Sequence, residues 1–446
     1  MASHGGGRRV GLGAFAVAAL GLALAHGWTD ARLSGAAGGP PSTATTASPR
    51  DLAPASPESV GFSSERLRRM DAMITRLVDQ KRLAGAVTLL TRHGKTVSVS
   101  TYGAADVESG APMRRDTIFR IASMTKPVTA VALMLLYEEG KWRLNDPVSR
   151  FIPSFTALKV YGGENADGTP KLEDPRTPMT MRDLMTHTAG LGYVINKTHP
   201  VDKLYRQHGV LDSSKPLQAM IDRLATLPLL AQPGSRWYYS IGIDVQGYLV
   251  ERLSGQPFDE FVQSRIFAPL GMKDTGFAVP AGSVARLARI HAESAGQLTP
   301  APLRGDATKR PAGPSGGGGL FSTADDYARF CQMLLNDGEF NGARLLAPRT
   351  VAMMRTNHVQ PDALKTMPPG TGWGLGFNVV TDAAAAGEPT PTGTYHWFGI
   401  NGTWFWIDPA SDLAFVGMIQ HQGPAAAELR LLSRNLVYQA LVAPAQ

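Results

Sequence analysis

The chain has 446 residues, of which 43% are apolar, and this is enough for one large or two medium domains with a substantial core. Its formal charge of +7 is modest and its basic residues are scattered, so a nucleic-acid partner is not expected. Cys331 is the single cysteine, which excludes an intrachain disulfide and a multi-cysteine metal site. The apolar run around Cys331 predicts a buried structural thiol.

The first residues have the order of an export signal. Arg8 and Arg9 precede an apolar run that ends in the small residues Ala23-Leu24-Ala25. This order predicts a signal peptide over residues 1–25, and an uncleaved membrane anchor is the alternative. Residues 26–57 are rich in Pro, Ser and Ala and predict a linker. We therefore expect an exported protein, either periplasmic or secreted.

The folded part is expected to begin near Glu58. An amphipathic run from Ser64 to Leu77 predicts a helix, because its apolar residues recur at helical spacing. Two β-rich runs follow at 86–90 and 96–100, and a glycine-containing turn separates them. This pattern predicts a β-hairpin.

A buried helix is predicted from Ser123 to Glu139. Residues 128–136 are almost wholly apolar, and Gly140 supplies the stop signal. Pro127 is tolerated only in the first turn, where backbone N–H groups lack partners within the helix. The helix must therefore begin at or just before Ser123.

The middle of the chain is loop-rich, with helical stretches such as 243–253. Near the C-terminus, the runs 403–407 and 413–419 predict a second hairpin, and 428–442 predict a final amphipathic helix. Strand pairs therefore lie at both ends, with helices between them. The simplest closure is an α/β (α+β) fold with one antiparallel sheet covered by helices. Two domains are expected. The sheet domain spans 58–145 and 300–446, and the mainly helical domain spans 146–299. A functional site would lie in the cleft between them.

Ser123-Met-Thr-Lys126 forms an S-x-x-K motif on the first turn of the predicted buried helix. Residues at i and i+3 share a helix face, so the Lys126 amine can reach the Ser123 hydroxyl. A serine hydroxyl needs a base to become a nucleophile. An apolar environment lowers a lysine pKa, so a neutral Lys126 is predicted to accept the proton. The alternative is an ordinary serine cap with a surface lysine.

Tyr239 lies in a loop before the helix at 243–253, from which it could enter a cleft and relay a proton to a leaving group. Its alternative role is an aromatic plug in the core. The segment from Gly313 to Gly317 formally matches G-x-S-x-G, with Ser315 as its serine. No buried strand precedes it, so we predict a flexible loop and not the strained turn of an α/β-hydrolase.

His187 could serve as a triad base, but a packed histidine at a helix end is the simpler interpretation. The sequence holds neither H-E-x-x-H nor a cysteine pair, so neither a metal nor an organic cofactor is expected. The sequence leaves the oligomeric state open.

Several stretches together resemble the serine β-lactamase-related superfamily, from about Glu58 to the C-terminal helix. The resemblance implies a β-lactamase/transpeptidase-like fold, and it is strongest to family VIII carboxylesterases, which are similar to class C β-lactamases. The stretches that carry it are Phe119-Arg-Ile-Ala-Ser-Met-Thr-Lys126, Leu144-Asn-Asp-Pro-Val148, Leu184-Met-Thr-His-Thr-Ala-Gly190 and Gly318-Gly-Leu-Phe-Ser-Thr323.

The resemblance also assigns roles to residues outside the S-x-x-K motif. Tyr239-Ser240-Ile241 fits the Y-S-x form of the second motif, so Tyr239 takes the role of the catalytic tyrosine. The third motif is K-T-G in β-lactamases and W-x-G here. Its residues, together with Ser240, are implied to line the substrate pocket: Trp397, Phe398 and Gly399. The implied oxyanion hole consists of the backbone N–H groups of Ser123 and Ile400.

The missing third-motif lysine removes a cation that helps bind the carboxylate of β-lactams and peptide termini. Trp397 and Phe398 would provide an apolar wall, which fits an uncharged ester better. The predicted function is hydrolysis of small uncharged carboxylic esters through an acyl-enzyme on Ser123. The alternatives are a β-lactam or D-Ala-D-Ala peptide substrate, acyl transfer to an alcohol or amine, and a non-catalytic binding domain.

Overall fold

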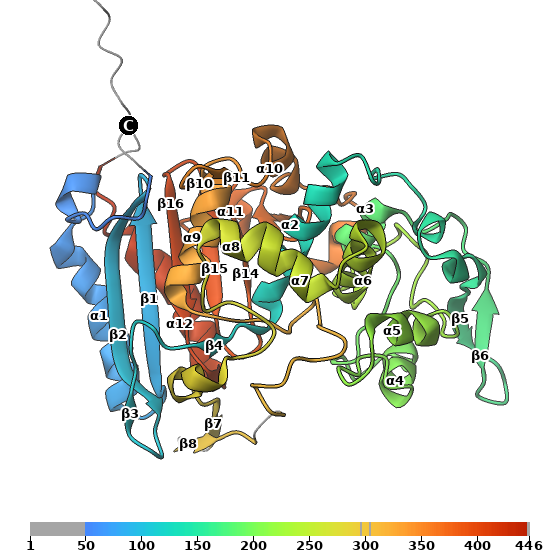
Figure 1. The fold of residues 1–446 in the computed structure, drawn as a ribbon, viewed down its shortest axis with the longest axis horizontal. Helices are drawn as coiled ribbons and strands as arrows, with labels where there is room; N and C mark the ends of the chain where they lie inside the picture. The colour runs from blue at the N-terminus through green and yellow to red at the C-terminus, as the bar shows by residue number, and fades with distance from the viewer. Residues whose placement is uncertain (1–49, 295–296, 303–304, 444–446) are drawn as a thin grey trace, which may run out of the picture. The chain divides into compact units, whose positions relative to one another are not determined.

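An antiparallel sheet of eight strands lies at the centre of the fold, with the order β12-β13-β14-β15-β16-β1-β2-β3 (Figure 1). In this computed structural model, the described residues are 50–294, 297–302 and 305–443. The strands of the sheet are β1 (Gly85–Arg92), β2 (Lys95–Asp106), β3 (Ala111–Pro112), β12 (Thr371–Trp373), β13 (Asn378–Val380), β14 (Tyr395–Phe398), β15 (Trp404–Asp408) and β16 (Leu413–Met418).

The two ends of the folded chain meet in this sheet, because β1 pairs with β16 as well as with β2. Both predicted hairpins, β1–β2 and β15–β16, are present. The fold is therefore the predicted one: a single antiparallel sheet joins the N-terminal and C-terminal strand pairs, and helices cover it.

Helices cover both faces of the sheet, as the alternation of side chains along its strands requires. On β1, Leu89 packs into a core shared with α2 (Thr125–Glu138) and α9 (Ala324–Leu335). The next residue, Leu90, packs into a second core with α1 (Ser64–Asp79) and α12 (Pro424–Tyr438). Cys331 is buried in α9, as predicted.

Helix α2 runs through the larger core. Every residue from Thr125 to Leu136 is buried, and the helix ends just before Gly140, whose φ of 72° is left-handed. A 3-10 turn, η2 (Ala122–Met124), leads into it. Ser123 therefore lies in the turn that starts the helix, as the position of Pro127 predicted.

A largely helical region lies beside the sheet, drawn in green in Figure 1. Its elements are β5 (Val160–Glu164), β6 (Pro170–Glu173), α3 (Met181–Met185), α4 (Pro200–Gln207), α5 (Leu217–Leu224), α6 (Gly242–Ser254) and α7 (Phe258–Val262). The described residues all belong to one compact unit, and the predicted division at 146 and 300 stays a prediction.

Shorter elements complete the described chain. They are η1 (Glu58–Val60), β4 (Phe119–Arg120), η3 (Val148–Arg150), η4 (Pro153–Ala157), η5 (Gln263–Phe267), α8 (Ala268–Leu270), η6 (Ala281–Arg286), β7 (His291–Ser294), β8 (Gln297–Pro300), β9 (Phe321–Ser322), β10 (Glu339–Phe340), β11 (Ala343–Arg344), α10 (Pro348–Met354), η7 (Ala363–Thr366), α11 (Ala383–Ala386) and β17 (His421–Gln422).

The predicted linker ends earlier than residue 57. The Leu52 N–H donates to the Gly94 carbonyl at 2.8 Å, and Pro54 forms a bridge with Thr96. These contacts attach the segment to the β1–β2 turn, so it belongs to the folded part. The predicted signal peptide at 1–25 lies outside the described residues. Within the part of the chain that the structure describes, no helix combines the length and hydropathy needed to span a membrane.

Candidate active site

The three predicted catalytic side chains meet at Ser123. The Tyr239 hydroxyl donates to Ser123 Oγ at 2.8 Å, and Lys126 Nζ donates to the same oxygen at 3.3 Å. Ala122, directly before the serine, has a φ of 45°, which is costly for a residue with a Cβ and is typical of functional turns. The S-x-x-K spacing therefore places the hydroxyl and the amine in contact, as predicted.

Lys126 is fully buried but well supplied with hydrogen-bond acceptors. Besides Ser123, its Nζ donates to the Gly317 carbonyl at 2.6 Å and to the Tyr193 hydroxyl at 3.3 Å. Its Nζ also lies 4.6 Å from the ring centre of Tyr239. These acceptors satisfy the donors of the ammonium form.

The charge of Lys126 differs from the prediction. Burial acts to lower the pKa of Lys126, but the fields of Tyr193, Tyr239 and Asp244 outweigh it, so the pKa lies above its ordinary value. The sequence-based prediction considered burial alone and gave a lowered pKa for Lys126, whereas the neighbouring groups reverse that direction. Both Lys126 and Tyr239 contact the Ser123 hydroxyl, so the two side chains together form the candidate base.

His187 holds the tyrosine loop in place. Its Nδ1 accepts the Ser240 N–H at 3.1 Å and lies 3.0 Å from Ser240 Oγ, and its backbone carbonyl accepts the Tyr238 N–H at 2.8 Å. Burial, and then the field of Lys126, lower the pKa of His187 well below its usual range, so it stays neutral. His187 is thus the packed histidine of the simpler interpretation. Ser240 is buried against it, and its role in lining a substrate pocket stays a prediction.

Tyr193 is a member of the site that sequence reasoning missed. Its hydroxyl lies on Lys126, and its ring packs edge-on against Tyr239 at 5.4 Å between centroids. Buried Asp202 fixes this loop, because it accepts the Tyr193 N–H at 2.7 Å and the Tyr238 hydroxyl at 2.5 Å. No local motif marks Tyr193, because its role arises only when its loop packs against α2.

The third motif forms one wall beside Tyr239. Trp397 is buried, and its ring lies 5.4 Å from that of Tyr239 and 4.6 Å from that of Trp373. The Phe398 ring contacts Trp397 at 4.9 Å and carries the Arg430 guanidinium at 3.7 Å from its centre. The wall is therefore aromatic as predicted, but it is not free of charge, because α12 brings a cation to Phe398.

Gly399 clamps the end of β14 against the segment before Ser123. Its N–H donates to the Thr403 carbonyl at 2.7 Å, and the Thr403 hydroxyl donates to the Ile121 carbonyl at 3.2 Å. The next residue, Ile400, has 58% of its surface exposed. The oxyanion hole formed by the N–H groups of Ser123 and Ile400 stays a prediction.

A Gly399→Ala variant should test this clamp. A Cβ at this position would lie 2.5 Å from both the Ile121 carbonyl oxygen and Thr403 Oγ1, so β14 must move away from Ser123. Misplacing one oxyanion donor typically costs about 10²–10³-fold in kcat. We expect a loss of that size with KM changed little, measured by steady-state ester hydrolysis, whereas wild-type kcat in the folded variant would argue against the clamp.

The G-x-S-x-G segment forms a loop, as predicted, but a tightly held one. The Ser315 hydroxyl donates to Asp244 Oδ1 at 2.5 Å, so this serine is engaged in a structural hydrogen bond. Gly317 supplies the carbonyl that accepts from Lys126. Within residues 50–294, 297–302 and 305–443, no group of three His, Cys, Asp or Glu side chains is placed to hold a metal ion.

A family model named Beta-lactamase matches residues 70–439. The chain belongs to the Beta-lactamase family. It is 38% identical over 360 residues to Protein Rv1367c of Mycobacterium tuberculosis, which covers 78% of this chain and 89% of that protein. It is 34% identical over 394 residues to Esterase EstB of Burkholderia gladioli, covering 81% and 93%.

A solved structure of the same fold is EstCE1, described as a hydrolase with promiscuous acyltransferase activity. It aligns with a TM-score of 0.73 and 31% identity, over 84% of this chain and 99% of that one. Family membership agrees with the resemblance first seen in the motifs around Ser123, Tyr239 and Trp397.

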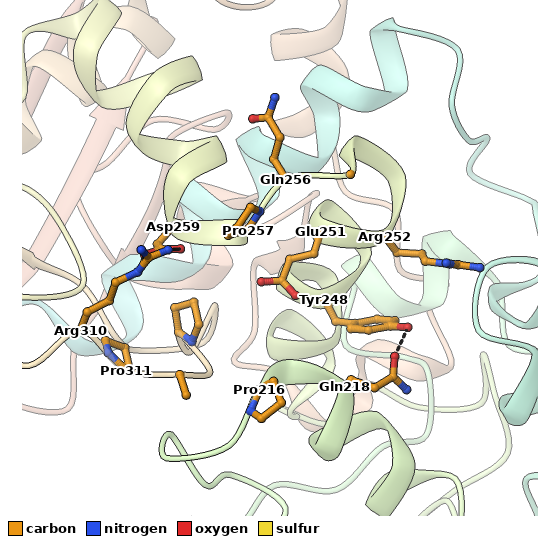
Figure 2. Close-up of a pocket in the computed structure, with 13 residues that line it drawn as sticks. Pro216, Gln218, Tyr248, Glu251, Arg252, Gln256, Pro257, Asp259, Arg310 and Pro311 are labelled. Atoms are coloured by element: carbon orange, nitrogen blue, oxygen red, sulfur yellow. Dashed lines mark hydrogen bonds and ion pairs between the residues drawn. The ribbon is translucent and has the colours of Figure 1, made fainter.

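This Beta-lactamase family member also has a separate surface cavity of about 740 Å³ at the C-terminal half of α6. Figure 2 shows Tyr248 hydrogen-bonded to Gln218 on one side of it, and Arg310 close to Asp259 on the other. Tyr248 and Arg310 are thus each paired with another side chain of the cavity.

Proposed function

We propose that this protein is a serine hydrolase that cleaves carboxylic esters through an acyl-enzyme on Ser123. The observation that carries the proposal is the contact of one hydroxyl, Ser123 Oγ, with both Lys126 Nζ and the Tyr239 hydroxyl. A serine held against a buried amine and a phenol has both an activating partner and a proton relay. The similarity to Esterase EstB supports an ester as substrate.

In the first stage, the Lys126–Tyr239 pair takes the proton of Ser123, and Oγ attacks the ester carbonyl carbon. The tetrahedral oxyanion is stabilised by the predicted N–H donors of Ser123 and Ile400. When it collapses, the carbon–oxygen bond to the alcohol breaks, and Tyr239 passes a proton to the leaving oxygen. In the second stage, the pair takes a proton from water, the hydroxide attacks the acyl carbonyl, and Ser123 recovers its proton as the acid leaves.

The aromatic wall favours small uncharged acyl groups, which pack against Trp397 without losing strong hydration. Arg430 is the observation that favours a second candidate, because its guanidinium at Phe398 could attract a substrate carboxylate. β-Lactams and D-Ala-D-Ala peptides carry such a group. Transfer of the acyl group to an alcohol uses the same acyl-enzyme, and the EstCE1 similarity supports it as a side reaction.

A comparison of two chromogenic substrates tests the substrate class. We expect kcat/KM for p-nitrophenyl butyrate to exceed that for nitrocefin by at least about 10²-fold, because the third motif lacks its lysine. Steady-state rates at matched enzyme concentration measure the ratio. Faster hydrolysis of nitrocefin would overturn the ester assignment in favour of a β-lactamase.

We also propose that the protein is exported to the periplasm or secreted. Arg8, Arg9 and the apolar run ending at Ala25 support this proposal. Fractionation of cells that express the full chain, with N-terminal sequencing of the product, distinguishes cleavage from a retained anchor.

A further inference from the structure

Asp244 is a fully buried carboxylate in the first turn of α6, and it takes no direct part in the steps described above. Its Oδ1 accepts two hydrogen bonds, from the Ser315 hydroxyl at 2.5 Å and from the Gly317 N–H at 3.0 Å. Its Oδ2 is buried and has no hydrogen-bond partner among the residues that the structure describes. A buried carboxylate with a bare oxygen is costly unless a nearby positive charge compensates it.

Lys126 supplies that charge, and a single residue connects the two groups. The N–H of Gly317 donates to Asp244, while its carbonyl accepts from Lys126 Nζ at 2.6 Å. The Thr129 hydroxyl donates to the Gly316 carbonyl at 2.7 Å, which attaches the same loop to α2 one turn beyond Lys126. The loop thus transmits the position of Asp244 to the amine.

Gly317 has no room for a side chain. A Cβ there would lie 2.4 Å from Asp244 Oδ2, closer than real contacts allow. The neighbouring Gly318 is different, because the nearest atom to its Cβ, the carbonyl carbon of Ala122, is 3.8 Å away. The close approach at Gly317 therefore serves the contact between the loop and Asp244.

The titratable groups that interact electrostatically with Lys126 are Tyr193, Tyr239, His187 and Asp244. Burial lowers the pKa of His187 and raises the pKa of Tyr193, so it acts against the charged form of both groups. Burial also raises the pKa of the Asp244 carboxyl, while Lys126 and the donors from Ser315 and Gly317 act against that rise. Asp244 is thus the acidic side chain of this group, and the charge of Lys126 and the two donors favour its ionised form.

We propose that Asp244 is a positioning residue that acts on Lys126 through the Gly317 peptide and serves as its buried counter-charge. The inference rests on the proposed function. It identifies Asp244 as the residue that controls the protonation of the Lys126–Tyr239 pair. The negative charge of Asp244 favours the ammonium form, so the Lys126–Tyr239 pair loses its proton at higher pH. The acylation rate should therefore rise with pH, and removing the charge should move that rise to lower pH.

Asp244→Asn isolates the charge, because the amide oxygen can still accept from Ser315 and Gly317. We expect the midpoint of the pH dependence of single-turnover acylation by p-nitrophenyl butyrate to fall by at least about one pH unit, the lower end of shifts caused by a nearby charge. Asp326→Asn is the matched control. Asp326 is also buried and accepts from the Asp274 N–H and the Thr275 hydroxyl, but it belongs to α9, and its variant should keep the wild-type midpoint.

The counter-charge role of Asp244 would be overturned if the Asp244→Asn midpoint equalled that of the wild type. A rate lowered equally at every pH would overturn it as well. Gly317→Ala and Gly318→Ala provide a second test if the Asn variant does not fold. We expect Gly317→Ala to lower the acylation rate at least about tenfold and to lower the midpoint, and Gly318→Ala to keep the midpoint. Equal midpoints in both glycine variants would contradict the proposal.

Failure of this inference is distinguishable from failure of the proposed function. If the wild-type enzyme forms no adduct on Ser123 with a fluorophosphonate, the proposed function fails. If the adduct forms and only the Asp244→Asn midpoint is unchanged, the ester hydrolase assignment stands and Asp244 loses its role.

Discussion

Replacing Ser123 by alanine is expected to lower kcat/KM for p-nitrophenyl butyrate at least about 10⁴-fold, the scale of losses when a serine nucleophile is removed. The variant keeps its fold, because η2 is held by backbone contacts such as the Ile121 N–H to the Leu320 carbonyl. Steady-state kinetics with a matched thermal melt measure both quantities.

Ser315→Ala is the informative companion, since Ser315 is the serine of the competing G-x-S-x-G segment. Its hydroxyl is bonded to Asp244, so this variant should still form a covalent adduct with a fluorophosphonate. Loss of labelling in Ser315→Ala together with retained labelling in Ser123→Ala would reverse the assignment.

Lys126→Met is expected to lower the acylation rate by about 10³–10⁴-fold, because it removes one member of the pair that accepts the Ser123 proton. Methionine has a similar length, but it leaves Asp244 without its counter-charge and the Gly317 carbonyl without its donor. The melting temperature should therefore fall. Stopped-flow acylation and calorimetry measure the two effects.

A loss smaller than tenfold in Lys126→Met would show that Tyr239 alone activates Ser123. An unchanged melting temperature would contradict Lys126 as the counter-charge of Asp244.

Local patterns predicted the part of the site that depends on local geometry. The position of Pro127 predicted where the helix begins. The spacing of Ser123 and Lys126 then predicted that the hydroxyl and the amine meet on the same helical turn. Tyr239 followed from the similarity of its motif to a known family. The sheet was predictable for a similar reason, because the hairpins are local and only one simple closure joins them.

Other contacts could not be predicted, because their partners come from distant segments. Tyr193 and Gly317 reach Lys126 from positions 67 and 191 residues away. Without those acceptors, burial alone predicts a neutral lysine, and with them the ammonium is favoured. Arg430 reaches Phe398 from α12 in the same way, which adds charge to a wall predicted to be apolar.

Composition misled the assignment of the N-terminal boundary. The segment around Leu52 and Pro54 has the Pro- and Ala-rich composition of a linker. Backbone contacts with Gly94 and Thr96 hold this segment against the hairpin. Backbone contacts of this kind could not be predicted from the side chains of the segment.

The covalent state of Ser123 during turnover tests the central claim most directly. Wild-type enzyme is mixed with excess p-nitrophenyl butyrate, quenched in acid within the first turnovers and digested for peptide mass mapping. We predict a butyryl group on the peptide that contains Ser123, with fragmentation placing it on that residue. Rapid turnover of the ester with Ser123 unmodified, and the acyl group on another side chain or on none, would contradict the account.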